Sequence, residues 1–178
     1  SDVRALKEVV TTEFNIEGYP DARYLQLIKD LRPAQATLVP DPPGVLTSNA
    51  GWNCSAQAKF LEPIIAQIQA LGVRVSLFME TNLAQIDQAK ALGADRIEFY
   101  TGPYAENYAS GPKAAVAPYQ LAALHAHAQG LRINQVSRQE HGLCHRIGPD
   151  ITHNAAQADQ PGAACGQPST QTPQPQRP

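Results

Sequence analysis

The sequence predicts an α/β fold in which helices cover a parallel β-sheet. Short apolar or alternating segments, typical of strands, take turns with longer segments whose apolar residues recur at helical spacing. Glycine closes the helical segments repeatedly, at Gly72, Gly93 and Gly130. Since strands that alternate with helices pair in parallel through right-handed crossovers, a doubly wound sheet and a (β/α)8 barrel both fit this order. A complete barrel needs about 200 residues or more, so a barrel here would be cut short.

The individual elements follow from the spacing of their apolar residues. In chain order they are a helix at 2–11, a strand at 14–17, a helix at 21–31, a strand at 36–40, a helix at 55–71, a strand at 73–80, a helix at 83–92, a strand at 96–100, a helix at 116–129 and a strand at 131–134. Asp21 is placed to cap the second helix, and Pro33 follows its end. The third helix is expected to be interrupted or shifted near Pro63. The segments 41–52 and 101–105 are predicted to be loops, and the first is long enough to suggest a function.

The length and composition indicate one packed domain followed by a different kind of segment. A chain of 178 residues can bury one sizeable core. Residues 135–178 contain few large apolar residues, show no periodicity and end in a run rich in proline and glutamine. We therefore expect an α/β domain at 1–134 and a disordered tail at 135–178.

Charge and cysteine content argue against several kinds of partner. A net charge of −2 and a pI near 6.2 give no electrostatic reason to expect binding to nucleic acid or to an anionic membrane. No apolar run approaches the roughly 20 residues of a membrane span. The first residues form no signal peptide, and the scattered Cys54, Cys144 and Cys165 suit a reducing compartment, so a cytoplasmic location is expected.

Two glutamates carry the candidate chemistry. Glu17 ends an alternating strand just before a glycine, where α/β barrels hold their catalytic groups, and Glu98 lies opposite the apolar face of the strand at 96–100. If both apolar faces pack on outer helices, the two carboxylates share one enclosed space. Burial and mutual repulsion then raise at least one pKa toward the range of a general acid or base. The alternatives are that Glu17 begins a solvated turn and that Glu98 pairs with Arg74 or Arg96.

Imine and metal chemistry are less well supported. The lysines fall on predicted helices or at their starts, so an enzyme-linked imine at a strand end is not expected. A zinc site could be sought at His141, Cys144 and His145, with His153 further on. This segment lacks the paired cysteines and the helical context typical of zinc sites, so no metal is expected.

Three further ring side chains are assigned structural roles. His125 and His127 lie two residues apart in an alanine-rich helix, so they face different ways. Surface or helix-packing roles are therefore expected for both. Trp52, in the long loop, is expected to close a contact with the core rather than to stack on a ligand.

Several runs of residues resemble the pyridoxine 5′-phosphate synthase family. In the family's order and at its spacing, they are 13–18 (EFNIEG), 37–40 (TLVP), 46–48 (LTS), 73–78 (VRVSLF) and 96–105 (RIEFYTGPYA). The similarity covers about residues 2–134 and implies a (β/α)8 barrel, here about strands 3 to 7, that forms homo-oligomers and uses no cofactor. The family joins 3-amino-2-oxopropyl phosphate to 1-deoxy-D-xylulose 5-phosphate, closing the pyridine ring of vitamin B6 with loss of water and phosphate.

The resemblance implies roles for three residues. Glu17 matches a glutamate that accepts protons in the ring-forming steps, and Glu98 matches one that stabilises the transition state. Thr47 matches a threonine that binds the deoxyxylulose phosphate substrate. The family's imine forms between its two substrates, which agrees with the lack of a lysine at a predicted strand end. Two rival hypotheses stay open, another phosphosugar-handling isomerase or lyase barrel and a catalytically inactive chain.

The sequence departs from the family pattern on both sides of this match. Two family motifs, Asn-x-Asp-His and His-Leu-Arg-Glu-Asp-Arg-Arg, are not found, although they supply a catalytic histidine and most phosphate contacts in the family. The run 134–137 (NQVS) stands where the family has Asn-Ala-Gly-His with its proton-donating histidine, and His141 does not match that position. We therefore expect the chain alone to be inactive and poorly folded, with a shifted reading frame after Asn134 as one origin of the tail.

Overall fold

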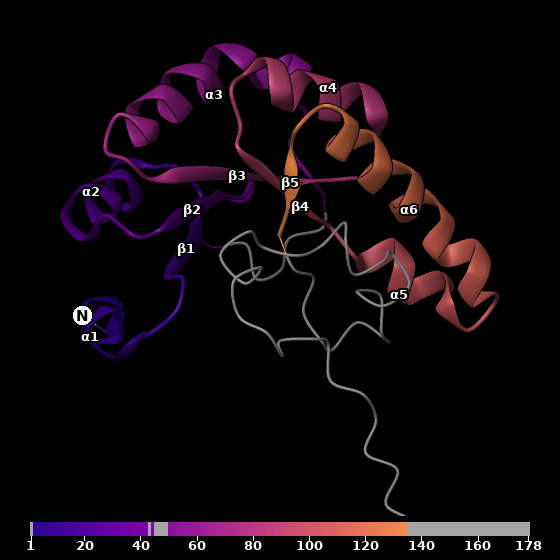
Figure 1. Ribbon diagram of the computed structural model, residues 1–178, viewed down its shortest axis with the longest axis horizontal. Coiled ribbons are helices and arrows are strands. Elements are labelled where there is room, and N and C mark those ends of the chain that lie inside the picture. Colours follow the sequence, from indigo (N-terminus) through magenta and orange to yellow (C-terminus); the bar gives the residue numbers. More distant parts are fainter. Residues whose placement is uncertain (1, 43, 45–49, 135–178) are drawn as a thin grey trace, which may run out of the picture.

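The computed structural model describes residues 2–42, 44 and 50–134 and contains one parallel sheet with its helices (Figure 1). Five strands lie in the strictly sequential order β1-β2-β3-β4-β5, and every neighbouring pair is parallel. The elements are α1 (Asp2–Val9), β1 (Asn15–Gly18), α2 (Ala22–Leu31), β2 (Gln35–Leu38), α3 (Cys54–Gln69), β3 (Arg74–Met79), α4 (Leu83–Ala91), β4 (Arg96–Phe99), α5 (Gly102–Tyr108), α6 (Pro112–Ala128) and β5 (Arg132–Ile133). The alternation predicted from the sequence is confirmed for these residues.

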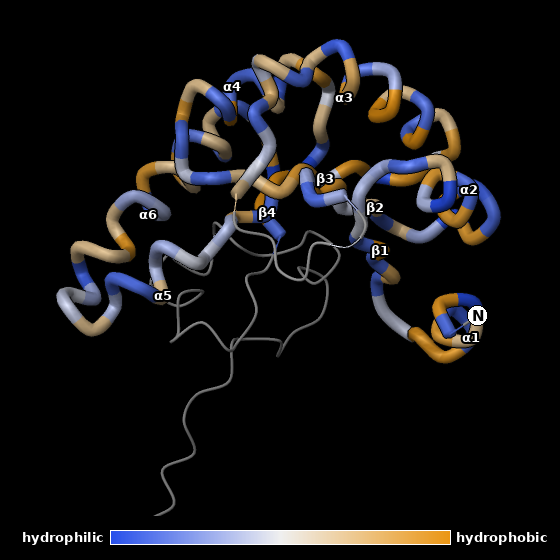
Figure 2. The backbone as a smooth tube through the Cα atoms, turned by 180° about the vertical axis from the view of Figure 1, so that it is seen from behind, coloured by the Kyte–Doolittle hydropathy of each residue, from blue (hydrophilic) through white to orange (hydrophobic). Residues whose placement is uncertain are grey.

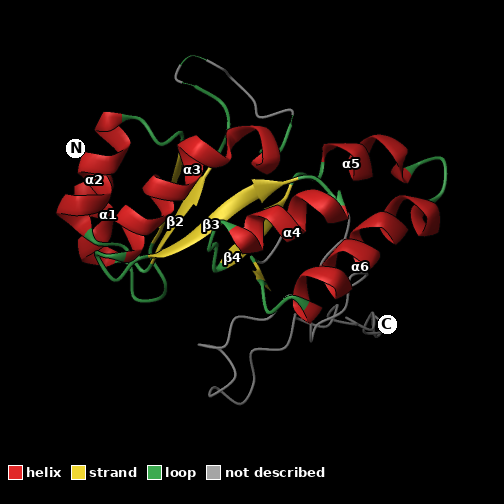
Figure 3. Ribbon diagram, turned by 90° about the horizontal axis from the view of Figure 1, so that it is seen from above, coloured by secondary structure: helices red, strands yellow, loops and turns green. Residues whose placement is uncertain are grey.

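The helices α2, α3, α4 and α6 form an arc around one face of the curved sheet (Figures 1 and 3). A sequential strand order with crossovers of one hand places all connecting helices on the same face, whereas a doubly wound sheet carries helices on both faces. The described residues therefore form an α/β fold that is consistent with part of a (β/α)8 barrel.

The core lies between this sheet face and the helices. Along each strand, alternate side chains point toward the helices and are buried. They are Ile16, Ala36, Leu38, Val75, Leu77, Met79, Ile97, Phe99 and Ile133. In Figure 2 the outer helices carry both apolar and polar stretches, as expected of helices that pack one face on the sheet.

The predicted helix boundaries hold at α2 and differ elsewhere. Asp21 caps α2 as predicted, because its carboxylate accepts the backbone N–H of Tyr24 at 2.7 Å. The expected interruption at Pro63 is wrong, since α3 runs through this exposed residue without a break. The helix α1 buries none of its residues, and its link to α2 is an exposed ion pair between Arg4 and Asp30 at 2.6 Å.

The prediction of a loop at 101–105 is wrong, because α5 begins at Gly102. The Gly-Pro pair looks like a turn, yet Pro103 stands in the first helical turn, where its missing N–H costs no hydrogen bond. A Cβ on Gly102 would lie 2.2 Å from the Tyr100 hydroxyl oxygen, so a larger residue there would have to displace the Tyr100 ring. Tyr104 then packs fully buried against α6, with its ring centroid 6.0 Å from that of Tyr119.

Candidate active site

The face of the sheet that points away from the helices is largely polar. Its side chains are Asn15 and Glu17 from β1, Gln35 and Thr37 from β2, Arg74, Ser76 and Phe78 from β3, Arg96 and Glu98 from β4, and Asn134 just after β5. Several of them are buried, with Thr37 and Ser76 at 0% exposure. The interiors of (β/α)8 barrels are more commonly filled by bulky branched side chains. Close packing of apolar side chains therefore does not account for the polar residues on this face.

Asn134 is the centre of a hydrogen-bond network on the inner face. Its Nδ2 donates to Glu98 Oε2 and to Ser76 Oγ, each at 2.9 Å, and its Oδ1 accepts from Gln35 Nε2 at 3.1 Å. These partners come from β4, β3 and β2, so one amide joins three strands. The network fixes the Glu98 carboxylate in one position.

A second group of bonds extends this network to the first strand. The Thr37 hydroxyl donates to Asn15 Oδ1 at 3.0 Å, and Gln35 Nε2 lies 3.3 Å from the same oxygen. The inner face is therefore connected from β1 to the residue after β5. Within the described residues, one buried atom of this network, Gln35 Oε1, has no hydrogen-bond partner.

Glu17 and Glu98 lie on this same face, and the pKa of each is raised. Burial raises the pKa of Glu98 above the ordinary glutamate range, and the hydrogen bond from Asn134 opposes that rise. Burial also raises the pKa of Glu17, and the negative charge of Glu98 adds to the effect. Each of the two carboxyl groups therefore keeps its proton to a higher pH than an ordinary glutamate does.

The position of Glu17 depends on the glycine that follows it. Gly18 lies against the ring of Tyr24, and a Cβ at Gly18 would be 2.6 Å from the ring carbon Cδ2. The Tyr24 hydroxyl donates to the Ile16 carbonyl oxygen at 2.9 Å, so the ring braces the end of β1 from the helix side. Burial, followed by the charge of Glu17, raises the pKa of Tyr24, which keeps the hydroxyl protonated as a donor.

The alternative of a Glu98 ion pair with Arg74 or Arg96 is wrong. Both arginines pair instead with Glu13, at 2.5 Å for Arg74 and 3.7 Å for Arg96. Sequence reasoning missed this role of Glu13, which lies before β1 and reaches the arginines only through the register of the assembled sheet. Consequently, Glu98 takes its hydrogen bond from a neutral amide and keeps a raised pKa.

Trp52, shortly before α3, lies at the carboxyl ends of β2 and β3. Trp52 is 2% exposed, and its indole N–H donates to the Leu38 carbonyl oxygen at 2.8 Å. Its backbone N–H donates to the Phe78 carbonyl oxygen at 2.9 Å. The core contact predicted for Trp52 is therefore confirmed. Thr47 lies outside the described residues.

The remaining candidates lie away from the inner face or outside the described residues. His125 is on α6, where its Nε2 lies 2.6 Å from the Asp87 carboxylate of α4, which fits the helix-packing role. The possible zinc ligands at His141, Cys144, His145 and His153 belong to the part that is not described. Within residues 2–42, 44 and 50–134, no group of three or more metal-binding side chains is found.

The lysines of the described part lie in helices, as the sequence predicted. They are Lys7, Lys29, Lys59, Lys90 and Lys113. None of the described strand ends therefore offers an amine for an imine linkage. Among the described helices, none is both long enough and apolar enough to cross a membrane.

Comparison with known proteins gives consistent matches. A family model described as Pyridoxal phosphate biosynthesis protein PdxJ matches residues 1–147. A pyridoxine 5′-phosphate synthase from Porphyromonas gingivalis is 52% identical over 134 residues, which cover 75% of this chain and 56% of that relative. Relatives of the same name from Cytophaga hutchinsonii and Bacteroides thetaiotaomicron are 44% and 42% identical, with the same coverage.

The matched relatives are much longer than the matched region. This chain spans about half the length, 56%, of the curated relatives it matches. Among solved structures, a xylose isomerase domain protein from Planctomyces limnophilus aligns with a TM-score of 0.46 and 14% identity, covering 81% of this chain and 62% of that one. A likeness this weak carries no argument about fold or function.

Proposed function

Because this chain belongs to the family of the pyridoxal phosphate biosynthesis protein PdxJ, as its sequence resemblance predicted, we propose that it carries the carboxylate half of a pyridoxine 5′-phosphate synthase site. The proposed reaction joins 3-amino-2-oxopropyl phosphate and 1-deoxy-D-xylulose 5-phosphate to pyridoxine 5′-phosphate, with release of phosphate and water. The observation that carries the proposal is the pair of inner-face glutamates with raised pKa values.

Ring closure of this kind needs groups that take up and return protons near neutral pH. A glutamate with an ordinary pKa is a weak base at that pH, and raising its pKa makes it a better one. Glu17 is the proposed proton acceptor, because its side chain is exposed toward the open inner face and can approach a substrate. The substrate gives a proton from one of its carbon atoms to the Glu17 carboxylate. The protonated Glu17 later donates this proton to a hydroxyl group, which leaves as water.

Glu98 has a different proposed role, because its surroundings hold it still. The amide of Asn134 binds one carboxylate oxygen, and Asn134 is itself held by Ser76 and Gln35. A fixed carboxylate can stabilise positive charge that develops on a nitrogen-containing intermediate without reorganising. Its negative charge also keeps the pKa of Glu17 raised.

Thr47 is proposed to bind the phosphorylated pentulose. The support is the place of Trp52, five residues further along the chain, which bonds to backbone carbonyls at the carboxyl ends of β2 and β3. In α/β barrels, loops at that end of the strands build the substrate site. The chemistry proposed here needs no cofactor and no metal, because the aminoketone substrate supplies the amine and the two substrates each supply a carbonyl group.

Finer statements about the whole protein are also proposals. The sheet is proposed to represent strands 3 to 7 of a (β/α)8 barrel, with the barrel domain at 1–134 and a separate segment at 135–178. A cytoplasmic location and a homo-oligomeric assembly are proposed for the longer family form, with phosphorylated small molecules as its ligands and neither nucleic acid nor membrane as partner.

A chain without turnover of its own is the second candidate. In the described part, β1 pairs only with β2 and β5 only with β4, so each end of the sheet has an edge without a described partner strand. Such edges favour association with other strands. The proposed histidine-dependent steps would also need groups that this sequence does not offer at the family positions.

The experiment separates these candidates by the product formed. The purified chain is incubated with both substrates, and pyridoxine 5′-phosphate is measured by liquid chromatography with mass detection. Product formation that Glu17→Gln and Glu98→Gln each reduce at least 100-fold, while the exposed Glu62→Gln does not, supports the synthase. Absence of product identifies the inactive chain. Isomerised or cleaved deoxyxylulose phosphate without the vitamin product identifies a different phosphosugar enzyme and contradicts the proposal.

A further inference from the structure

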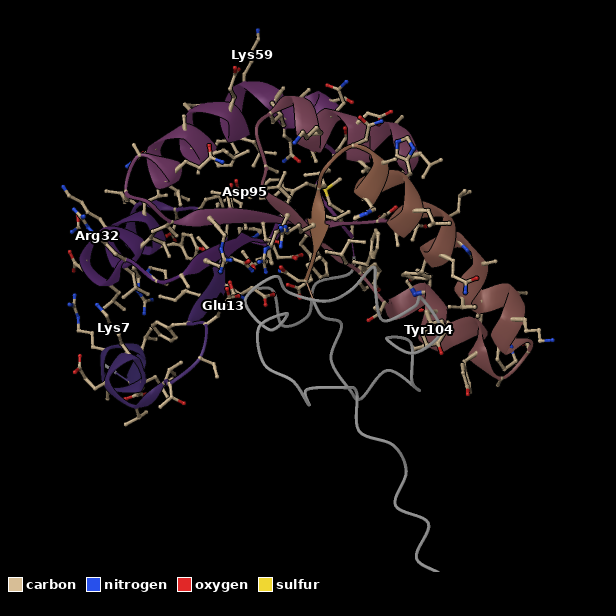
Figure 4. All side chains as sticks on the ribbon, viewed as in Figure 1. Lys7, Glu13, Arg32, Lys59, Asp95 and Tyr104 are labelled. Atoms are coloured by element: carbon tan, nitrogen blue, oxygen red, sulfur yellow. The ribbon has the colours of Figure 1, made fainter. Side chains whose placement is uncertain are left out.

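A basic pocket, separate from the two inner-face glutamates, lies at the amino-terminal edge of the sheet, at the end opposite Gly18. Its volume is 590 Å³, and it is lined by the turns that lead into β4 and β5. Its charged lining residues are Arg74, Lys90, Asp95, Arg96 and Arg132 (Asp95 is labelled in Figure 4). Since one water takes about 30 Å³ of liquid, the pocket has room for an ion larger than water.

Three arginines begin three consecutive strands and share the inner face. Arg74 starts β3, Arg96 starts β4 and Arg132 starts β5. Arg96 and Arg132 are direct partners in the parallel register, so two like charges stand opposite each other. Like charges in such positions repel and destabilise the sheet unless a negative group lies between them.

Arg96 is held in place but is not fully satisfied. Its side chain is 4% exposed, and its buried Nε has no hydrogen-bond partner within the described part of the chain. Burial and the neighbouring charge of Arg74 lower the pKa of its guanidinium, which reflects a surplus of positive charge. A buried guanidinium normally has its N–H groups bonded, often in a two-point contact with an oxyanion.

The nearby carboxylates are already used. Asp95 accepts the backbone N–H of Val75 at 2.8 Å and the amide of Gln69 at 3.0 Å. Glu13 bonds to Arg74 at 2.5 Å and is 3.7 Å from Arg96, beyond hydrogen-bond distance.

The charge balance at the pocket stays positive. Among the described residues, four cationic and two anionic side chains lie at the pocket. They are Arg74, Lys90, Arg96 and Arg132 on one side and Glu13 and Asp95 on the other. The carboxyl ends of α4 and α6 add about half a negative charge each. That leaves roughly one unit of positive charge around a buried guanidinium with a free N–H. We propose that this pocket binds a phosphate dianion, free or as the phosphate group of a small phosphomonoester, on Arg96 and Arg132.

Thermal melting of the 178-residue chain at constant ionic strength tests this site. Sodium phosphate is compared with sodium chloride, because chloride provides the same screening without a two-point contact. Saturating phosphate should raise the melting temperature by about 4 °C or more, since a ligand that binds only the folded state stabilises it. If the chain melts without a clear transition, the same binding should appear as a phosphate-specific gain in helical circular dichroism.

Variants locate the effect. Arg96→Gln should abolish the phosphate response. Arg132→Gln and Lys90→Gln, which change exposed side chains and leave the core intact, should weaken the apparent affinity at least fivefold. Arg23→Gln, an equal loss of charge on the exposed face of α2, should leave the response unchanged. No phosphate-specific change in either signal overturns the proposal, and so does an apparent phosphate affinity that is unchanged in Arg132→Gln and Lys90→Gln.

Discussion

Replacement of Asn134 by alanine should lower the free energy of unfolding by more than the loss of one hydrogen bond would. Asn134 is 8% exposed and links Glu98, Ser76 and Gln35 through its three shorter hydrogen bonds, beside a longer one to Thr37 Oγ1 at 3.4 Å. The alanine variant removes all three bonds and leaves their partners buried. Its effect therefore tests whether the inner face behaves as one network.

The magnitude follows from the partners that are lost. A buried neutral hydrogen bond contributes about 1 kcal/mol, and a bond to a charged group about 1.5–3 kcal/mol. Two neutral bonds and one to a carboxylate give a loss of about 3.5–5 kcal/mol. With an m value of about 2 kcal/mol/M, the urea midpoint should fall by about 1.8–2.5 M. Loss of the Asn134 donor should also raise the pKa of Glu98 further, because that bond is what opposes the rise.

Urea denaturation followed by circular dichroism measures the midpoint, with sucrose present to stabilise the folded chain. The control is Asn107→Ala, which removes one exposed asparagine whose Nδ2 donates to the Pro103 carbonyl oxygen at 2.7 Å. That variant should cost under about 1 kcal/mol. Equal losses in the two variants would refute the network, because a buried hub and an exposed single bond would then be equivalent.

Three further predictions concern pH, backbone and core. Because the pKa values of Glu17 and Glu98 are raised in the folded state, that state keeps protons that the unfolded state loses. The free energy of unfolding should therefore fall as pH rises above about 4.5. Glu98→Gln should flatten this pH dependence, which urea denaturation at several pH values measures. Gly18→Ala should destabilise the chain by about 1–3 kcal/mol, because its methyl group collides with the Tyr24 ring; an unchanged melting temperature would contradict this contact. Trp52→Phe should cost about 1–3 kcal/mol by leaving a buried strand carbonyl without its donor, whereas a neutral result would show that the indole bond contributes nothing.

Much of the fold could be predicted because its patterns are local. Strand alternation placed Glu17 and Glu98 opposite the apolar residues that pack on the helices, and both do lie on the inner face. Glycines after helices marked the turns correctly, and Asp21 caps its helix as expected. The prediction failed at Gly102, where a glycine and a proline begin a helix instead of a loop. There the deciding factor is a distant contact, the burial of Tyr104 against α6.

The site could be predicted only in part, because its hydrogen bonds join residues far apart in the sequence. Asn134 lies 36 residues from Glu98 and 99 from Gln35, so no spacing rule connects them. Glu13 takes both arginines that might have paired with Glu98, and only the assembled register reveals this. Sequence alternation can assign a face to a side chain, but it cannot assign a partner on that face.

Titration of the glutamate side-chain carboxyl carbons by NMR tests the central claim most directly. The two resonances are followed with pH in the unaltered chain and in Glu98→Gln. If Glu17 and Glu98 form one coupled acid-base pair, both pKa values lie above the ordinary glutamate value, and the pKa of Glu17 falls when Glu98 is replaced. Titration of both groups with the exposed glutamates, and no change of Glu17 in the variant, would contradict the account.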